Sequence, residues 1–272
     1  MNTPLDWRSP SANSGVLAAR DIHLTRQGRA VLQGINLQAH PGRVLALIGP
    51  NGAGKSSLLG ALAGWMAPSL GEVSLDGKPL SAWPTMSLAR RRAMLSQNVQ
   101  LGFAFLVEEV VMLGRTPGGR HATHAQDAVI VEQALRLAQV AHLRGRNYLE
   151  LSGGEQQRVQ LARVLAQVWE QQDGPAWLLL DEPEAGLDIA HQHDMLKQMR
   201  ALSRRGYGVI VVLHDLNLAA RYADEIALLT QGRLVRLGTP DYALDAQALS
   251  KVYGLVLDRV PVNQGQWIVM PR

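Results

Sequence analysis

The sequence has no cysteine among its 272 residues. Disulfide bonds, thiolate metal sites and cysteine nucleophiles are therefore excluded, and a reducing compartment fits this composition. Long apolar runs are missing as well. The longest, such as Val209–Leu213, have the length of a strand and fall far short of the roughly 20 residues that a helix needs to cross a bilayer. We therefore expect a cytoplasmic protein that reaches a membrane only through a partner.

Aromatic residues make up only 5% of the chain, and the net charge of +4 is small for its length. Basic residues cluster at Arg90–Arg92 and pair at Arg204–Arg205, with no aromatic residues interleaved. This pattern is typical of solvated helix faces and not of a nucleic-acid surface, so we expect no nucleic-acid partner.

The first 15 residues also lack an apolar segment. They are rich in Ser, Pro and Asn and carry both Asp6 and Arg8. This composition predicts a disordered tail over residues 1–15 and not a signal peptide.

Short apolar runs alternate with stretches of helical spacing along most of the chain. Runs typical of buried strands occur at Arg43–Ile48, Trp177–Leu180 and Val209–Leu213. Apolar residues three and four apart predict helices at Ser56–Trp65, Ala128–Leu143 and Gly154–Val168. Buried strands that alternate with helices indicate an α/β fold with a mainly parallel sheet.

Other regions depart from this alternation. Strands at Val16–Thr25 and Val31–Gln38, with the turn Gln27–Gly28 between them, predict an antiparallel β region. The mostly helical interval before Trp177 predicts an inserted helical subdomain over roughly residues 97–170. Near the end, the pattern predicts a helix at Ala246–Val252 and a hairpin formed by Leu257–Val262 and Trp267–Met270.

A glycine-rich loop follows the first buried strand and precedes a predicted helix. It fits the pattern G-x-x-x-x-G-K-[ST], which binds nucleotide phosphates through main-chain N–H groups, a lysine and the end of a helix. Lys55 supplies a charge for the outer phosphates and Ser56 a hydroxyl for Mg²⁺. The predicted ATP-binding residues are Gly49, Pro50, Asn51, Gly52, Ala53, Gly54, Lys55, Ser56 and Ser57.

Two carboxylates leave the strand that begins at Trp177. Catalytic residues of α/β proteins lie at the carboxyl ends of parallel strands. Asp181 is suited to hold a Mg²⁺-bound water or Ser56. Glu182 faces the other way and is suited to polarise an attacking water.

A second candidate phosphate cradle opens the helix that follows residue 152. Ser152 and Glu155 have the spacing of a capping box, which is by itself a complete structural explanation. Gly153 and Gly154, however, lower the helix propensity while exposing main-chain N–H groups. Two cradles in one chain suggest that two chains share two nucleotides.

These motifs occur in the order found in ABC-type ATPases, which this chain resembles over roughly residues 16–255, leaving 256–272 as a C-terminal extension. The residues that carry the resemblance are Gly49–Ser56, Gln97, Leu151-Ser152-Gly153-Gly154-Glu155, Leu180–Pro183, Leu187-Asp188 and His214.

The resemblance implies a P-loop NTPase-type core and a head-to-tail homodimer, with each ATP between the phosphate loop of one subunit and the signature Leu151–Glu155 of the other. It further implies that Gln97 is a lid residue that contacts Mg²⁺ and the permease. Asp188 would lie at the dimer seam, and His214 would hold the γ-phosphate and the attacking water, making Glu182, His214 and Gln97 the catalytic set.

Three positions depart from the family pattern. Arg26 stands where the family usually has an aromatic residue that stacks on adenine, and a guanidinium can also stack on a base. Glu184 and Gly186 stand where a small hydroxyl residue and alanine are more common. These two positions lie at the expected dimer seam, so they bear on its geometry.

Within this family the chain is most similar to ATPases of bacterial importers for iron chelates, haem and vitamin B12, and among these to the haemin-import group. The residues that carry this similarity are 103–115, 165–180, 191–193, 213–224 and 238–254. It implies two transmembrane permease subunits, a periplasmic haem-binding protein, and a peripheral position on the cytoplasmic face of the bacterial inner membrane. A siderophore or vitamin B12 cargo is the alternative.

Non-transport ABC ATPases remain a third possibility. Those of DNA repair usually have a long coiled coil for which the interval from Lys55 to Leu151 is too short. Those of translation usually have two nucleotide domains, whereas this chain has one set of motifs.

Overall fold

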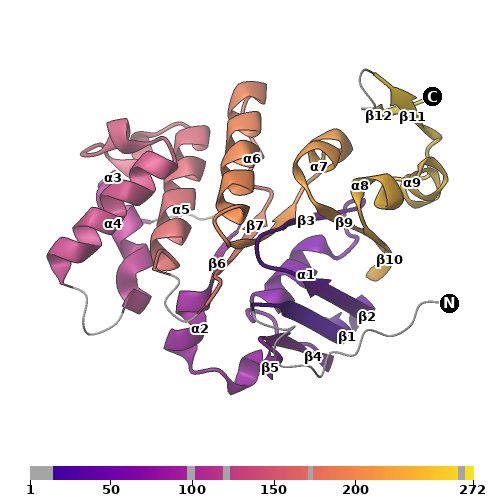
Figure 1. Cartoon of the computed structure of the whole chain (residues 1–272), viewed down its shortest axis with the longest axis horizontal. Helices are drawn as coiled ribbons and strands as arrows, with labels where there is room; N and C mark the ends of the chain where they lie inside the picture. The colour runs from indigo at the N-terminus through magenta and orange to yellow at the C-terminus, as the bar shows by residue number, and fades with distance from the viewer. Residues whose placement is uncertain (1–14, 97–101, 119–122, 171–173, 263–266) are drawn as a thin grey trace.

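The structure is a computed structural model that describes residues 15–96, 102–118, 123–170, 174–262 and 267–272. Its strands form an antiparallel sheet of four strands, a sheet of six strands and a separate two-stranded hairpin. Figure 1 shows helices α3, α4 and α5 at one end of the molecule and the C-terminal hairpin at the other.

The four-stranded sheet is the predicted antiparallel region. Its order is β2-β1-β4-β5, with the strands β1 (Leu17–Arg26), β2 (Arg29–Ala39), β4 (Leu70–Leu75) and β5 (Lys78–Pro79). Gln27 and Gly28 join β1 to β2 with φ of 49° and 75°, the left-handed values that a two-residue hairpin turn requires.

The six-stranded sheet has the order β10-β9-β3-β8-β7-β6 and is parallel except for β10. This confirms the predicted α/β fold. Its strands are β3 (Val44–Ile48), β6 (Arg92–Leu95), β7 (Trp177–Asp181), β8 (Gly208–Val212), β9 (Glu225–Thr230) and β10 (Arg233–Gly238).

Both faces of this sheet are covered, so its central strands are continuous apolar runs. In β3, Val44, Ala46 and Ile48 enter one core cluster, whereas Leu45 and Leu47 enter the other. The first core includes side chains of α6 (Ile189–Ser203) and α7 (Leu216–Tyr222), and the second includes those of α1 (Lys55–Leu62) and α2 (Thr85–Arg91).

Helices occupy the described part of the expected insertion, where α3 (Val107–Met112), α4 (His124–Leu137) and α5 (Gly153–Gln167) pack on one another. Short 3-10 turns connect them at Leu113–Gly118, Ala141–Leu143 and Tyr148–Glu150, with another at Leu80–Ala82 outside the insertion. The limits of a helical subdomain at 97–170 stay a prediction.

One predicted helix was wrong in its extent. The helix expected at Ala128–Leu143 begins earlier, at His124, and ends at Leu137. Thr123 and Gln126 form a capping box at its start, and Gln139 has φ of 59°, which a right-handed helix cannot contain.

The C-terminal segment folds as the sequence indicates. It consists of α8 (Pro240–Ala243), α9 (Ala246–Tyr253) and the antiparallel pair β11 (Leu257–Pro261) and β12 (Trp267–Pro271). The Asn217 side chain in α7 exchanges two hydrogen bonds with the main chain of Val269, which fastens the hairpin.

Within the described residues, none of the helices has both the length and the apolar content that a membrane crossing requires.

Candidate active site

Three neighbouring parallel strands deliver the predicted catalytic groups. The phosphate loop follows β3, His214 follows β8, and Asp181 ends β7. Because β3, β8 and β7 are parallel neighbours, their carboxyl ends lie at one edge of the sheet. The sheet topology therefore brings together residues that are distant in sequence.

The phosphate loop packs against its own chain through two glycines. Gly49 has φ of 144°, and a Cβ there would lie 2.1 Å from the Leu229 carbonyl oxygen. Gly54 has φ of 100°, and a Cβ there would lie 2.9 Å from the Leu32 side chain. Both positions therefore require glycine for conformation and for space.

Lys55 begins α1 and is only 6% exposed. Its Nζ donates to the carbonyl oxygens of Gly49 at 2.8 Å and Pro50 at 3.2 Å, so the ammonium lies inside the loop. Burial lowers the pKa of Lys55, and the carboxylates of Glu182 and Asp181 oppose that shift. The position is suited to neutralise phosphate oxygens that enter the loop.

Ser56 and Asp181 are joined directly. The Ser56 Oγ donates to Asp181 Oδ1 at 3.0 Å, and the Asp181 carboxylate is 7% exposed. Burial raises the pKa of Asp181, while the Ser56 hydrogen bond acts against this. A hydroxyl beside one carboxylate suits a Mg²⁺ whose remaining ligands are phosphates and waters.

No group of three or more His, Asp or Glu suited to a metal occurs in the described ranges.

Glu182 and His214, both predicted catalytic residues, form a second contact. The His214 Nε2 lies 2.5 Å from Glu182 Oε1, and the Glu182 side chain is 12% exposed whereas that of His214 is 46% exposed. Glu182 has φ of 50°, a left-handed conformation that turns the chain immediately after the strand ends at Asp181. Strain of this kind in a non-glycine residue is typical of functional positions.

The signature residues form the predicted capping box at the start of α5. The Ser152 main-chain N–H donates to Glu155 Oε2 at 2.8 Å, and the Glu155 N–H donates to Ser152 Oγ at 3.4 Å. The Ser152 hydroxyl and main chain lower the pKa of Glu155. Leu151 is buried and precedes this cap.

The two signature glycines differ in their surroundings. A Cβ at Gly154 would lie 2.9 Å from Leu187, whereas a Cβ at Gly153 would meet no atom within 4 Å. Packing within this chain therefore explains Gly154 and not Gly153. Open space beside a helix start is where an anion from outside the chain can approach.

Asp188 caps α6 and is exposed. Its carboxylate accepts from the His191 main-chain N–H at 2.9 Å and lies 2.8 Å from His191 Nδ1. His193 points elsewhere, with its Nδ1 2.7 Å from the Tyr222 hydroxyl. The two histidines thus diverge, and the His193 side chain is partly buried.

The structure shows the backbone conformation at two of the positions that depart from the family pattern, Arg26 and Gly186. Arg26 ends β1 and pairs with Arg29 across the hairpin turn. Gly186 has φ of 75°, which alanine would adopt only with strain. Gln97, the expected lid residue, lies outside the described residues.

Two further residues lie against this site: Glu184, which the sequence placed only at the expected dimer seam, and Tyr253, to which it gave no role. Glu184 is only 6% exposed, and burial raises the pKa of its carboxyl to about 7, while the nearby main-chain N–H of His214 opposes this rise. Burial raises the pKa of the Tyr253 hydroxyl to about 12, and the nearby main-chain N–H of Gly49 opposes this rise. In the sequence, the signal that could have indicated Glu184 is a charged residue in an otherwise apolar turn, and the signal for Tyr253 is a tyrosine in the C-terminal helix.

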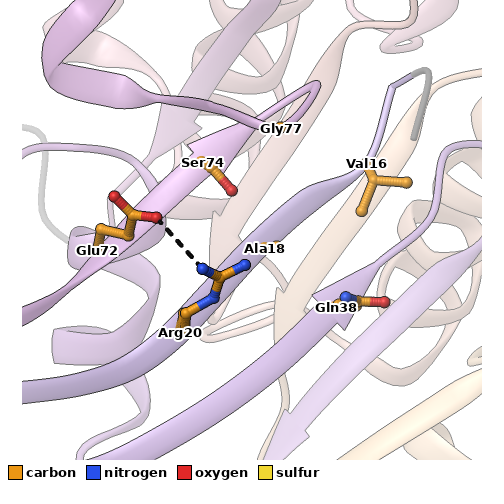
Figure 2. Close-up of a pocket in the computed structure, with 7 residues that line it drawn as sticks. All are labelled: Val16, Ala18, Arg20, Gln38, Glu72, Ser74 and Gly77. Carbon is orange, nitrogen blue, oxygen red and sulfur yellow. Dashed lines mark ion pairs between the residues drawn. The ribbon is translucent and has the colours of Figure 1, made fainter. Parts of the chain in front are cut away.

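A shallow hollow of about 40 Å³ lies apart from these groups, on the antiparallel sheet. Figure 2 shows Arg20 and Glu72 facing each other across it, 3.9 Å apart. Its lining includes none of the predicted site residues.

Comparison with protein families gives a match to the ABC transporter family over residues 32–185. The chain is 52% identical to the hemin import ATP-binding protein HmuV of Pseudomonas entomophila strain L48, with 94% of this chain and all of the relative covered. It is also 52% identical to the protein of the same name from Gloeobacter violaceus, with 88% of each chain covered.

Solved structures share the fold. The ATP-binding cassette MJ1267 of an ABC transporter, in its ADP conformation, superposes with a TM-score of 0.76 at 22% identity over 88% of this chain and 97% of its own. CbiO1 from Clostridium perfringens, described as part of the ABC transporter complex cbiONQ, gives a TM-score of 0.72 at 27% identity over 89% and 91%.

Proposed function

This chain belongs to the ABC transporter family, and from that premise we propose that it is the ATP-hydrolysing subunit of an importer for haemin. The observation that carries the enzymatic part is the pairing of Ser56 with Asp181 and of Glu182 with His214 at one edge of the sheet. The assignment of haemin as the cargo rests on similarity along 94% of this chain to relatives named for hemin import.

In the proposed reaction the phosphate loop and Lys55 hold the outer phosphates of ATP. Ser56 and Asp181 would hold Mg²⁺, which when bound neutralises charge on the phosphate oxygens. Glu182 orients and deprotonates the attacking water, and Gln97 completes the lid.

His214 lies beside Glu182 and keeps a partly exposed ring, so it can reach both that water and the γ-phosphate.

As an ATPase that powers transport, the protein works in a complex with transmembrane permease subunits. We propose that two copies of this chain dock under two permease subunits on the cytoplasmic face of the inner membrane. They close on two ATP molecules and reopen after hydrolysis. A periplasmic haem-binding protein delivers cargo through the permease.

Reconstitution of this chain with the permease tests the identity of the cargo. ATPase activity is measured with haem-loaded, siderophore-loaded and vitamin B12-loaded binding proteins, each compared with its unloaded form. Stimulation by the haem-loaded protein alone is expected. Stimulation by one of the other two and not by haem would reassign the cargo while leaving the ATPase assignment in place.

A further inference from the structure

A cleft of about 270 Å³ lies between the end of α1, strand β4, helix α2 and the start of β6. Its lining includes none of the residues to which the hydrolysis scheme above gives a role. Arg92 is the basic residue in this lining. Most of the other side chains are apolar, among them Ala61, Met66, Pro68, Val73, Leu80 and Leu88.

Arg92 is a largely buried cation inside this cleft. A Cβ at Gly64 would lie 2.9 Å from Arg92 Nη2, so the guanidinium lies against the main chain of another lining residue. Its Nε is buried and has no hydrogen-bond partner within the part of the chain that the structure describes. Burial lowers the pKa of Arg92 to about 10. A buried charge without a counter-ion destabilises the fold that contains it.

The neighbouring Arg91 shows how this chain partners a buried arginine. Arg91 is 2% exposed and donates to Asp76 Oδ2 at 2.7 Å and to the Pro175 carbonyl oxygen at 3.1 Å. The acidic residue in the lining of the cleft, Glu72, is directed to another arginine, since it lies 3.9 Å from Arg20 on β1. The fold thus gives Arg91 a carboxylate, whereas Arg92 is left for a carboxylate from outside the chain.

The surroundings of Arg92 indicate what kind of group enters the cleft. A guanidinium can bind a carboxylate through two parallel hydrogen bonds, and removal from water strengthens such a pair. Trp65, which lies between the lining residues Gly64 and Met66 in the sequence, is 60% exposed. An exposed large aromatic residue beside a buried arginine is typical of a protein contact surface.

We propose that this cleft is a docking site for the permease, in which Arg92 pairs with an Asp or Glu carboxylate that is flanked by apolar side chains on a permease segment. The inference rests on the complex with permease subunits described above, and it names the residue and the charge through which this chain recognises them. The permease carboxylate compensates in the complex for the charge that is buried in the isolated chain.

The first test compares Arg92→Met, which removes the charge and keeps an unbranched side chain, with Arg92→Lys, which keeps the charge. The Kd of the full chain for detergent-solubilised permease and the Tm of the isolated chain are measured. Arg92→Met should raise Kd by about tenfold or more, whereas Arg92→Lys should stay within about threefold of the parent. The Tm of Arg92→Met should equal or exceed that of the parent, because an uncompensated buried charge is removed.

Arg205→Met is the matched control, because it removes an exposed arginine that follows the end of α6, and its Kd should equal that of the parent. If Arg92→Met has the Kd of the parent and a lower Tm, the arginine is structural and the proposal is overturned. An Arg92→Lys chain that binds as weakly as Arg92→Met also overturns it. So does octanoate binding that depends on Arg92 while the Kd for the permease does not, since the cleft would then take a small amphiphile.

A second variant leaves Arg92 in place, so it does not depend on how the cleft tolerates substitution there. Ser81 is an exposed residue of the lining. Ser81→Glu offers Arg92 a carboxylate from its own chain and should raise Kd for the permease by about tenfold, whereas the uncharged Ser81→Gln should stay within about threefold of the parent. Equal Kd values for Ser81→Glu and Ser81→Gln would contradict recognition by charge.

ATPase activity separates this inference from the proposed function. The kcat of the isolated Arg92→Met chain should stay within about twofold of the parent, because Arg92 has no role in hydrolysis. A parent chain that does not bind the permease at all would contradict the proposed complex. A parent that binds the permease and hydrolyses ATP, together with an Arg92→Met chain that binds equally well, would overturn the docking role and leave the proposed function intact.

Discussion

The two phosphate cradles of this chain differ in how completely the chain itself surrounds them. In the phosphate loop, Gly49 and Gly54 press against neighbouring main chain and side chains, and Lys55 is buried. In the signature, Ser152 is exposed, and Gly153 faces open space. The phosphate loop is therefore enclosed by its own chain, and we call it the enclosed half of the site. The signature presents helix N–H groups outward, and we call it the open half.

The difference indicates that the signature is complementary to something outside the chain. A two-fold symmetric pair of identical chains satisfies both halves at once, because each gives a phosphate loop and receives a signature. Substitutions in each of the two cradles test this division.

Glu182, the proposed catalytic base, belongs to the enclosed half of the site, and its substitution should have the largest effect on kcat. Glu182→Gln removes the proposed base while keeping the size of the side chain, so kcat should fall by about a hundredfold or more. ATP affinity should remain, because Lys55 and the loop are unchanged. Steady-state ATPase and equilibrium ATP-binding measurements check this, and undiminished turnover would contradict the base assignment.

Mixed dimers test whether the halves belong to different chains. Lys55→Ala disables the loop half, and Gly153→Asp places an anion in the open space of the signature half. Each variant alone should be inactive.

Mixed at equal amounts, half of the dimers are heterodimers with one intact site, so activity should return to about a quarter of the parent for independent sites. Gly153→Ala is the matched control, because it adds bulk without charge. No recovery where heterodimers are demonstrated would argue against independent sites shared between two chains.

The positions of the residues around the phosphate loop follow most directly from the sequence. The loop, Asp181 and Glu182 follow directly from a strand, a motif and the rule that catalytic groups gather at carboxyl ends of parallel strands. The end of α4 was not predictable, because the left-handed Gln139 carries no sequence signal.

Contacts such as Glu184 with His214 and Tyr253 with Gly49 depend on tertiary packing between segments distant in sequence. The periodicity of the chain could not reveal them.

The pH dependence of folding stability should have opposite signs for Glu184, beside the enclosed half of the site, and for Glu155 in the signature. The pKa of Glu184 rises from 4.5 to about 7 on folding, so the native state holds its proton over a window in which the unfolded chain releases it. Stability should therefore fall as pH rises through this window, by about 3 kcal/mol in total.

Thermal unfolding of the parent and Glu184→Gln between pH 5 and 8 measures this, because the variant should lose that slope. Glu155 of the signature is the contrast. Hydrogen bonds from Ser152 lower its pKa, so its contribution is present above its ordinary pKa and lost as pH falls. A Glu184→Gln protein with the same pH slope as the parent would show that Glu184 does not titrate there.

A small effect is expected at Tyr253 of the C-terminal helix α9, whose hydroxyl lies near the main chain of Gly49, the first residue of the phosphate loop. Tyr253→Phe removes the hydroxyl that lies near the Gly49 N–H and keeps the ring, so the free energy of unfolding should fall by about 1 kcal/mol at most. KM for ATP should rise by about twofold, because the loop loses one support.

Leu249→Ala in the same helix is the matched control, since it removes buried packing without touching the loop. It should lower the melting temperature more than Tyr253→Phe does while leaving KM unchanged. If both variants raise KM for ATP alike, the phosphate loop responds to the stability of the C-terminal segment in general. The enclosed half of the site would then include α9.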